Sequence, residues 1–189
     1  HMFTGAGHGR LSTVHGPLYT DRMRVADFMS LLQERTLSLL PQELRDCTAR
    51  ARFVWFQVHY HSPKVHYEVW LARKTERIEI GLHFEGPHDF SYRWAELMAE
   101  HMPEIAARLG PQVELEEWTA SWTRIHQTVP YDPPSDALAD EVARRLAEMI
   151  TVLQPIVERE RENVPPEMES EPAPARAAGG RRFGRGRRK

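Results

Sequence analysis

The sequence predicts an α+β domain in which helices pack on a mainly antiparallel sheet. Residues 53–85 alternate apolar and polar side chains with the period of two that half-buried strands show. Apolar residues recur at helical spacing on both sides of this stretch, and the composition from residue 163 onward cannot form a core. The expected order is helix, three-stranded antiparallel meander, helix, one or two further strands, long C-terminal helix and disordered basic tail.

These patterns divide the chain into three parts. Residues 1–19 are rich in Gly, His, Ser and Thr and are expected to be a flexible segment. Residues 20–162 have the size and apolar content of a single α+β domain. Residues 163–189 are first rich in Pro, Glu and Ala and then in Arg and Gly, a composition typical of disorder.

The first helix is expected from Thr20, with Thr20 or Asp21 as its N-cap. Its apolar stripe consists of Val25, Phe28, Met29, Leu31 and Leu32. Pro41 interrupts the apolar stretch 37–44, which is therefore a short continuation or a separate turn.

The meander is expected to contain strands 53–61, 64–73 and 76–85, joined by two-residue turns at 62–63 and 74–75. The side chains that face the core are Val54, Phe56, Val58, Tyr60, Val65, Tyr67, Val69, Leu71, Ile78, Ile80, Leu82 and Phe84.

A second helix follows, with Asp89 as a possible cap, apolar residues at helical spacing over 94–109, and Gly110 as its stop. Pro103 either kinks this helix or divides it into two. Residues 113–117 and 120–128 alternate again and form one bent strand or a second hairpin. Residues 133–136 (Pro-Pro-Ser-Asp) then start a long amphipathic helix that extends to about Arg161.

The predicted meander register places three histidines side by side on the polar face. His59 lies opposite His66, and His66 lies opposite His83. Because neighbouring strands are about 4.8 Å apart, these imidazoles could share a zinc ion or another divalent transition metal. Glu68 and Glu85 lie on the same face and could orient a ring or act as a general base, and His61 could substitute for His59.

The alternative is that the row is simply the polar side of a sheet, because a one-residue slip in either turn would break it. If the row is intact and holds no ion, like-charge repulsion is expected to lower the pKa values of the three imidazoles. Stability would then be lost as the pH falls.

The order helix, three strands, helix, strand over about residues 20–128 is similar to the core of restriction-endonuclease-like domains. That resemblance implies a Mg²⁺ site built from an acid on the second core strand and an acid-x-Lys motif on the third. Glu68 could be the first acid, but Glu79 is followed by Gly81 and Glu85 by Pro87 at the lysine position. The resemblance therefore implies a catalytically degenerate member that binds or scaffolds.

The C-terminal tail resembles the arginine-glycine segments of proteins that bind RNA or single-stranded DNA. Its cations and its aromatic ring could contact phosphates and bases. The cations expected to bind nucleic acid are Arg181, Arg182, Arg185, Arg187, Arg188 and Lys189. The alternative is a solubilising tail or one that docks on the acidic body, which carries 18 basic and 27 acidic residues once the seven cations from Arg176 onward are set aside.

Composition narrows the setting of the protein. One cysteine, Cys47, excludes an internal disulfide framework and a multi-cysteine zinc ribbon. No apolar run approaches the roughly 20 residues of a membrane helix, so a cytoplasmic protein without a membrane contact is expected. The sequence contains no P-loop, dinucleotide fingerprint or Gly-x-Ser-x-Gly elbow.

Three accounts of function follow. The first is a non-catalytic binding or accessory protein that associates with nucleic acid or with a nucleic-acid-processing partner. The second is a metal-dependent hydrolase that uses His59, His66 and His83, with Glu68 or Glu85 as base. The third is a protein–protein interaction domain whose helix 135–161 docks on another chain.

Overall fold

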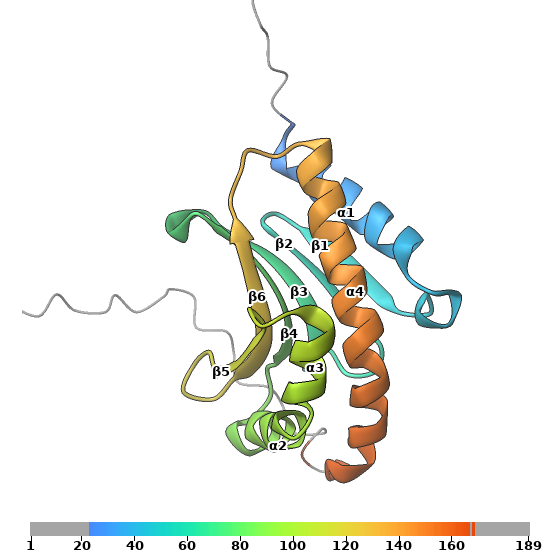
Figure 1. Cartoon of the computed structure of the whole chain (residues 1–189), viewed down its shortest axis with the longest axis vertical. Coiled ribbons are helices and arrows are strands. Elements are labelled where there is room, and N and C mark those ends of the chain that lie inside the picture. Colours follow the sequence, from blue (N-terminus) through green and yellow to red (C-terminus); the bar gives the residue numbers. More distant parts are fainter. Residues whose placement is uncertain (1–22, 167, 169–189) are drawn as a thin grey trace, which may run out of the picture.

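The computed structural model describes residues 23–166 and residue 168. These residues form a six-stranded sheet with strand order β1-β2-β3-β4-β6-β5, in which every neighbouring pair is antiparallel. The helices lie against this sheet, as Figure 1 shows. The α+β class and the order of elements are thereby confirmed.

The helices and strands have well-defined bounds. The helices are α1 (Val25–Leu39), α2 (His88–Ala99), α3 (Met102–Leu109) and α4 (Asp136–Glu160). The strands are β1 (Thr48–Arg52), β2 (Trp55–His59), β3 (Val65–Ala72), β4 (Arg77–Phe84), β5 (Glu114–Glu117) and β6 (Thr123–Pro130).

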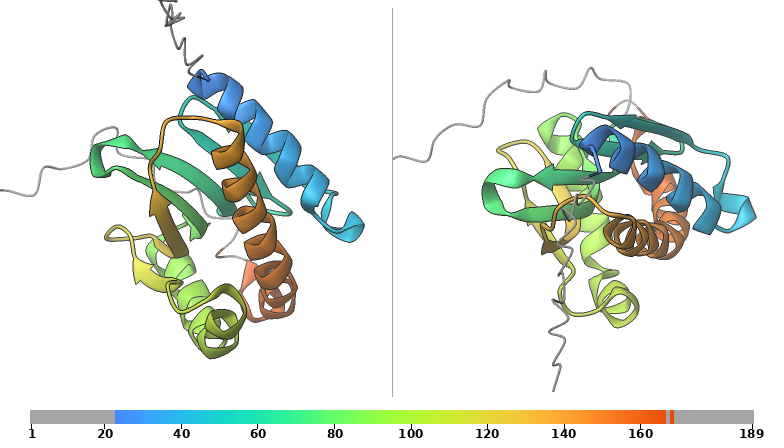
Figure 2. Two further views of the ribbon diagram at one scale, coloured as in Figure 1. Left: turned by 45° about the horizontal axis from the view of Figure 1, so that its top comes forward. Right: turned by 90° about the horizontal axis from the view of Figure 1, so that it is seen from above.

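Helices α1 and α4 lie side by side over one face of the sheet (Figures 1 and 2). The core between them contains fully buried side chains such as Phe28, Phe56, Ile80 and Leu146. Because strand side chains alternate, every second residue of β3 and β4 faces this core, and the residues between them face the opposite side. Each large core side chain stabilises the fold by about 1.5–3 kcal/mol through removal of apolar surface from water.

The expected first strand, 53–61, is wrong in its bounds. The chain turns at Phe53, which has a positive φ of 43°, and the preceding residues form an additional edge strand, β1. This strand has the sequence Thr-Ala-Arg-Ala-Arg and lacks the bulky apolar residues by which a strand is usually identified. The meander therefore has four strands, not three.

The register between β3 and β4 is the one that the alternation predicted, with His66 opposite His83. The turn between them is longer than the expected two residues. Residues Arg73–Thr75 form a short 3-10 turn, and Glu76 takes the left-handed conformation with a φ of 53°. The register is unchanged, because the turn gains Arg73 from the end of β3 and Glu76 from the start of β4, one residue from each strand.

The other open alternatives are resolved by the structure. Pro103 lies in the first turn of α3 and marks a separate helix, because proline is compatible with that position. Residues 113–128 form a hairpin of β5 and β6. Ser135 caps α4 by accepting a hydrogen bond from the Leu138 N–H, and α4 ends at Glu160, one residue before the expected end.

Within residues 23–166, none of the helices combines the length and the apolar content that a bilayer crossing requires. The expected start of the first helix at Thr20, the flexible segment 1–19 and most of the tail 163–189 lie outside the described residues.

Candidate metal centre

The polar face of the sheet, on the side away from α1 and α4, holds a cluster of buried histidines and carboxylates. On β3, Tyr67 and Val69 face the helices, so His66 and Glu68 face the opposite side. The His66 and His83 rings are stacked, with centroids 5.4 Å apart and planes 20° apart. Both are almost fully buried, with exposed fractions of 3% and 1%.

Glu85, directly after β4, brings a carboxylate to both rings. Its Oε1 lies 3.8 Å from His66 Nε2 and 3.4 Å from His83 Nδ1. One donor atom from each of these three residues lies within 4.8 Å of the donors of the other two. Ligands at about 2.0–2.1 Å from a tetrahedral zinc ion are about 3.4 Å from one another. The His66, His83 and Glu85 donors are therefore close to the spacing of a metal site.

The remaining nitrogen of each ring also lies close to an oxygen atom. His66 Nδ1 lies 2.8 Å from the carbonyl oxygen of Pro63, which fixes the tautomer that carries its lone pair on Nε2. His83 Nε2 lies 3.1 Å from Glu79 Oε1, and Glu79 in turn accepts a hydrogen bond of 2.6 Å from Arg124 Nη1. Metal-binding histidines usually have such a carbonyl or carboxylate on the second nitrogen.

Neither nitrogen of His83 makes a hydrogen bond of normal geometry within the described residues, although carboxylates lie 3.1 and 3.4 Å away. Short distances at unfavourable angles indicate attraction between charges rather than aligned hydrogen bonds. Buried polar atoms are nearly always hydrogen-bonded, so an exception of this kind requires an explanation such as a bound ion.

The charges around His83 change its titration. Burial by itself lowers the pKa of the His83 imidazole, but Glu79 and Glu85 outweigh it and raise that pKa to about 9. The expectation that all three imidazoles have lowered pKa values is therefore wrong for His83. Burial, His66 and Arg50 do lower the pKa of His59.

Three neighbours shape the cluster from outside the row. The indole of Trp118, between β5 and β6, contacts the His83 ring edge-on at 4.9 Å, and the Arg124 guanidinium lies 5.3 Å from that indole. Gly81 leaves room above the sheet, because a Cβ there would be 3.1 Å from His83 Nε2.

Not all of the expected site residues meet. His59 is half-buried and is the residue after the last paired position of β2 with β3, Val58–Tyr67. It is not part of the group formed by His66, His83 and Glu85. His61 is exposed and contacts Glu158 of α4 at 2.9 Å, so it does not substitute for His59.

Glu68 is buried beside His66, with its Oε2 3.7 Å from Nε2 of that ring. The side-chain amide of Gln57 donates to Glu68 and lies 3.1 Å from the same His66 nitrogen. An ion at His66 would take the place of this amide contact, and Glu68 would then be a fourth ligand or a nearby base.

A second group of candidate ligands lies at the sheet edge and consists of Glu114, Glu116 and His126. Its geometry is less suited to an ion, because Glu116 already forms an ion pair of 2.5 Å with Arg124. Glu116 and Glu114 are also more exposed than the carboxylates of the first group. Burial and Arg124 lower the pKa of His126.

Comparison with protein-family models, with curated proteins and with solved structures found no match. The resemblance to restriction-endonuclease-like domains remains a prediction. Neither Glu79 nor Glu85 has the lysine of that motif: Glu79 pairs with Arg124 and His83, and Glu85 faces both histidines. The site therefore has a histidine-rich ligand set that the resemblance does not imply.

Proposed function

We propose that this protein binds a divalent transition-metal ion through His66 Nε2, His83 Nδ1 and a carboxylate oxygen of Glu85. The observation that carries the proposal is the buried pair of rings beside Glu85: His66 Nδ1 lies 2.8 Å from Pro63 O, and neither nitrogen of His83 makes a hydrogen bond of normal geometry within the described residues, although Glu79 and Glu85 lie 3.1 and 3.4 Å away. This arrangement directs the remaining nitrogens toward Glu85. Two imidazoles and a carboxylate are ligands that suit zinc and other divalent transition metals.

The charges of the cluster support the same proposal. Glu68, Glu79 and Glu85 are all buried, and buried carboxylates require positive charge close by. Arg124 provides one such charge to Glu79. In the metal-free protein His83, whose pKa is raised to about 9, provides another. A divalent ion between His66, His83 and Glu85 would replace that single charge with two beside Glu85 and Glu68.

The ligand set favours metal-dependent hydrolysis as the activity of such a centre. Three protein ligands leave a fourth position for water, and zinc lowers the pKa of a bound water to about 7. Glu68, 3.7 Å from His66 Nε2, is then the carboxylate in place to accept a proton.

The metal content of the untagged protein, measured by mass spectrometry after incubation with zinc and desalting, tests the proposal. We expect about one ion per chain in the wild type and a loss of most of it in His66→Ala and His83→Ala. Glu85→Gln, which keeps the size of the side chain, should retain the fold and weaken zinc binding. Cobalt substitution should give the visible bands of a low-coordinate nitrogen and oxygen site.

His61→Ala is the matched control, because His61 is an exposed histidine that contacts Glu158 on the helical side. It should bind as much zinc as the wild type. A wild type that holds no zinc at micromolar free metal, or equal zinc in all four variants, would rule out the centre. Thermal melts of each variant distinguish a lost ligand from a lost fold.

The other accounts of function rest on different residues. Nucleic-acid binding by Arg181, Arg182, Arg185, Arg187, Arg188 and Lys189 remains a prediction about residues outside the described part of the chain. For the interaction-domain account, α4 already uses residues such as Val142, Leu146 and Leu153 inside the core of its own domain.

A further inference from the structure

One end of the polar face differs in character from the histidine cluster. It lies at the end of the sheet that carries both the β1–β2 and the β3–β4 turns, and we call it the basic-aromatic end. Its residues are Arg50, Arg52, Phe53, Trp55, Trp70 and Arg77.

The strand register brings these residues together on one face. Arg52 is opposite Trp55, and Trp55 is opposite Trp70. Directly opposed residues on antiparallel strands have Cβ atoms about 4.5–5.5 Å apart, so the three side chains form one row across β1, β2 and β3. Both tryptophans are half-buried, and each leaves part of its indole accessible.

Phe53 extends this aromatic surface at the β1–β2 turn. Its side chain is 84% exposed, the highest value among the large apolar side chains of the described residues. Its φ of 43° is unfavourable for a residue with a Cβ. The exposed ring and the strained backbone each lower stability. Strained residues of this kind are concentrated where a ligand binds.

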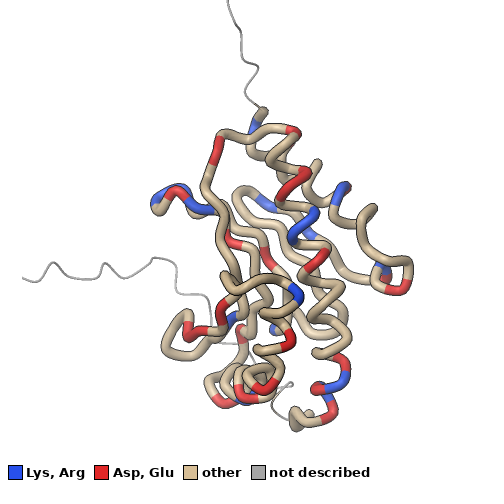
Figure 3. The backbone as a smooth tube through the Cα atoms, viewed as in Figure 1, with Lys and Arg blue, Asp and Glu red and all other residues tan. Residues whose placement is uncertain are grey.

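The charge here is opposite to that of the body. Segments 48–59 and 70–79 contain five cations and two acids, whereas the chain before Arg176 has 18 cations and 27 acids. One of the two acids, Glu79, is buried and paired with Arg124. Figure 3 shows the turn after β3 with cationic positions on both sides of a single acidic one. Arg50, Arg52 and Arg77 are exposed.

We propose that the basic-aromatic end binds single-stranded nucleic acid. Bases stack on Trp55, Trp70 and Phe53, and phosphates contact Arg50, Arg52 and Arg77. Accessible aromatic rings beside arginines form the standard platform for unpaired bases, since every base offers a π-face and every linkage a negative charge. A duplex keeps its bases stacked inside and cannot use such rings.

This inference does not depend on the proposed metal centre, although the two surfaces share a face. Trp70 and His66 are four residues apart on β3, which corresponds to about 13 Å. A strand bound across Trp55 and Trp70 could therefore extend toward Glu68 and His66.

Fluorescence anisotropy with a labelled oligothymidine and a labelled oligouridine tests the inference on the full chain. We expect Phe53→Ala, Arg52→Ala and Trp70→Leu each to weaken binding by about 5- to 50-fold. Arg52→Ala should also lower the slope of log affinity against log salt by about 0.7. The wild type should prefer the single strand to its duplex, and its tryptophan fluorescence should be quenched on binding.

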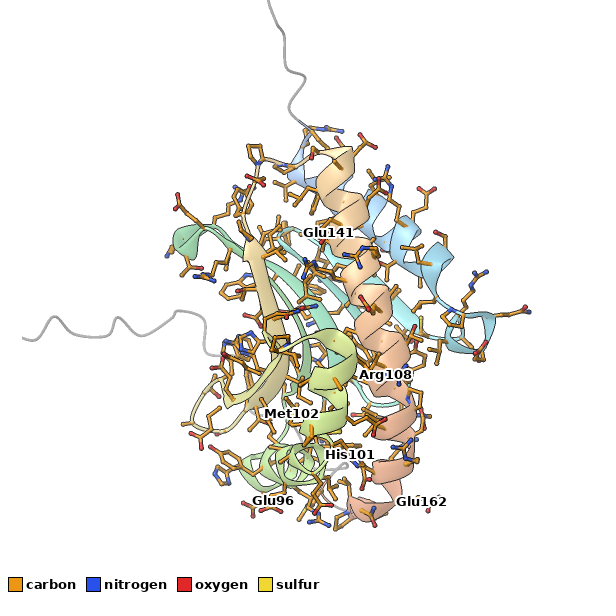
Figure 4. All side chains as sticks on the ribbon, viewed as in Figure 1. Glu96, His101, Met102, Arg108, Glu141 and Glu162 are labelled. Carbon is orange, nitrogen blue, oxygen red and sulfur yellow. The ribbon has the colours of Figure 1, made fainter. Side chains whose placement is uncertain are left out.

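Arg108→Ala and Arg144→Ala are matched controls, because both arginines lie on the helical side, where they line one groove between α1, α3 and α4. Figure 4 shows Arg108 beside α4. These variants should bind as the wild type does. Equal affinity in all five variants would place any binding outside the basic-aromatic end and overturn the inference. Equal affinity for duplex and single strand would also overturn it.

The three sheet-face variants need a check on their fold. Phe53 and Arg52 are exposed, so Phe53→Ala and Arg52→Ala should melt like the wild type. Zinc content, measured on the same samples, keeps the two proposals separate: loss of nucleic-acid binding with unchanged zinc supports the inference alone. If Trp70→Leu loses both nucleic-acid binding and zinc and its melt is altered, its fold is damaged. The inference is then judged on Phe53→Ala and Arg52→Ala.

Discussion

Phe53 holds a backbone conformation that costs an ordinary residue about 1–2 kcal/mol and that glycine adopts freely. Its ring is almost fully exposed, so little burial compensates for this strain. Phe53→Gly should therefore raise the free energy of unfolding by about 0.5–1 kcal/mol, even though it removes a large side chain. Urea unfolding followed by circular dichroism measures the difference.

Phe53→Ala is the control for this prediction, because alanine loses the ring but keeps the Cβ that causes the strain. It should be within about 0.5 kcal/mol of the wild type. If Phe53→Gly proves less stable than Phe53→Ala, the ring or its backbone contributes packing that the exposed geometry does not show. A gain in stability together with weaker oligonucleotide binding is the combination expected of a residue retained for binding.

Single residues also show which parts of the candidate site the sequence predicts and which it does not. His66 opposite His83 followed from period-two alternation in two adjacent strands, because register there depends on short-range pattern. The contact between Glu79 and Arg124 joins residues 45 positions apart and depends on the pairing of β4 with β6. No local pattern in the sequence specifies that pairing. The sequence does predict that Glu79 lies on the same face as His83, because the two residues are an even number of positions apart on β4.

At the scale of the elements, β4 places its only glycine next to the histidine cluster. A Cβ at Gly81 would be 3.1 Å from His83 Nε2 and 3.0 Å from His126 Cβ, closer than ordinary contact distances of about 3.5–4.0 Å. Gly81→Ala should therefore displace the His83 ring. We expect a loss of about 1–3 kcal/mol in unfolding free energy and a weaker affinity for zinc.

Chemical unfolding of Gly81→Ala measures the loss of unfolding free energy, and zinc titration of the same variant measures the loss of affinity. Unchanged values in both measurements would mean that the face above β4 has more room than the structure indicates. A loss of stability with normal zinc affinity would locate the strain at the backbone oxygen of Ile125, which also lies 3.1 Å from that position.

The elements themselves were predictable to different degrees. Helix α4 was identified nearly to the residue, because a capping serine, a long apolar stripe and absence of strand signals all agree. Strand β1 is not predictable in this way, because its inward-facing residues are alanines, which bury little and carry no strand signal. The length of the β3–β4 turn was also underestimated, since a left-handed glutamate at position 76 is not a typical turn residue.

At the scale of the whole molecule, the two faces of the sheet carry different kinds of side chain. One face packs against α1 and α4, and the other carries the histidine cluster and the basic-aromatic end. Alternation in the sequence predicted this division. It could not predict that six charged or titratable side chains of the polar face would be buried, namely His66, Glu68, Glu79, His83, Glu85 and His126. Their burial depends partly on Trp118, which the β5–β6 hairpin brings over His83.

The buried cluster makes the stability of the metal-free protein depend on pH. Despite burial, Glu79 and Glu85 raise the pKa of His83 to about 9, from about 6.5 in the unfolded chain. A raised pKa means that the stabilisation is fully present below about pH 6.5 and is lost as the pH rises through about 9. Relative to His83→Gln, the chelator-treated wild type should therefore lose about 2–4 kcal/mol of unfolding free energy over that interval.

The difference between wild type and His83→Gln is the quantity to measure, by urea unfolding at several pH values. The lowered pKa values of His59 and His126 act in the opposite direction below about pH 6.5, and His83 is itself one cause of the lowered pKa of His126. The comparison is therefore made from about pH 6.5 upward, where neither of these two imidazoles titrates. A difference that stays constant with pH would mean that His83 is neutral in the folded protein. With saturating zinc the sign should reverse, because a metal-bound imidazole has no proton to lose and zinc binds more tightly as the pH rises. Stability that falls with pH in chelator and rises with pH in zinc would connect the titration of His83 to metal binding in one experiment.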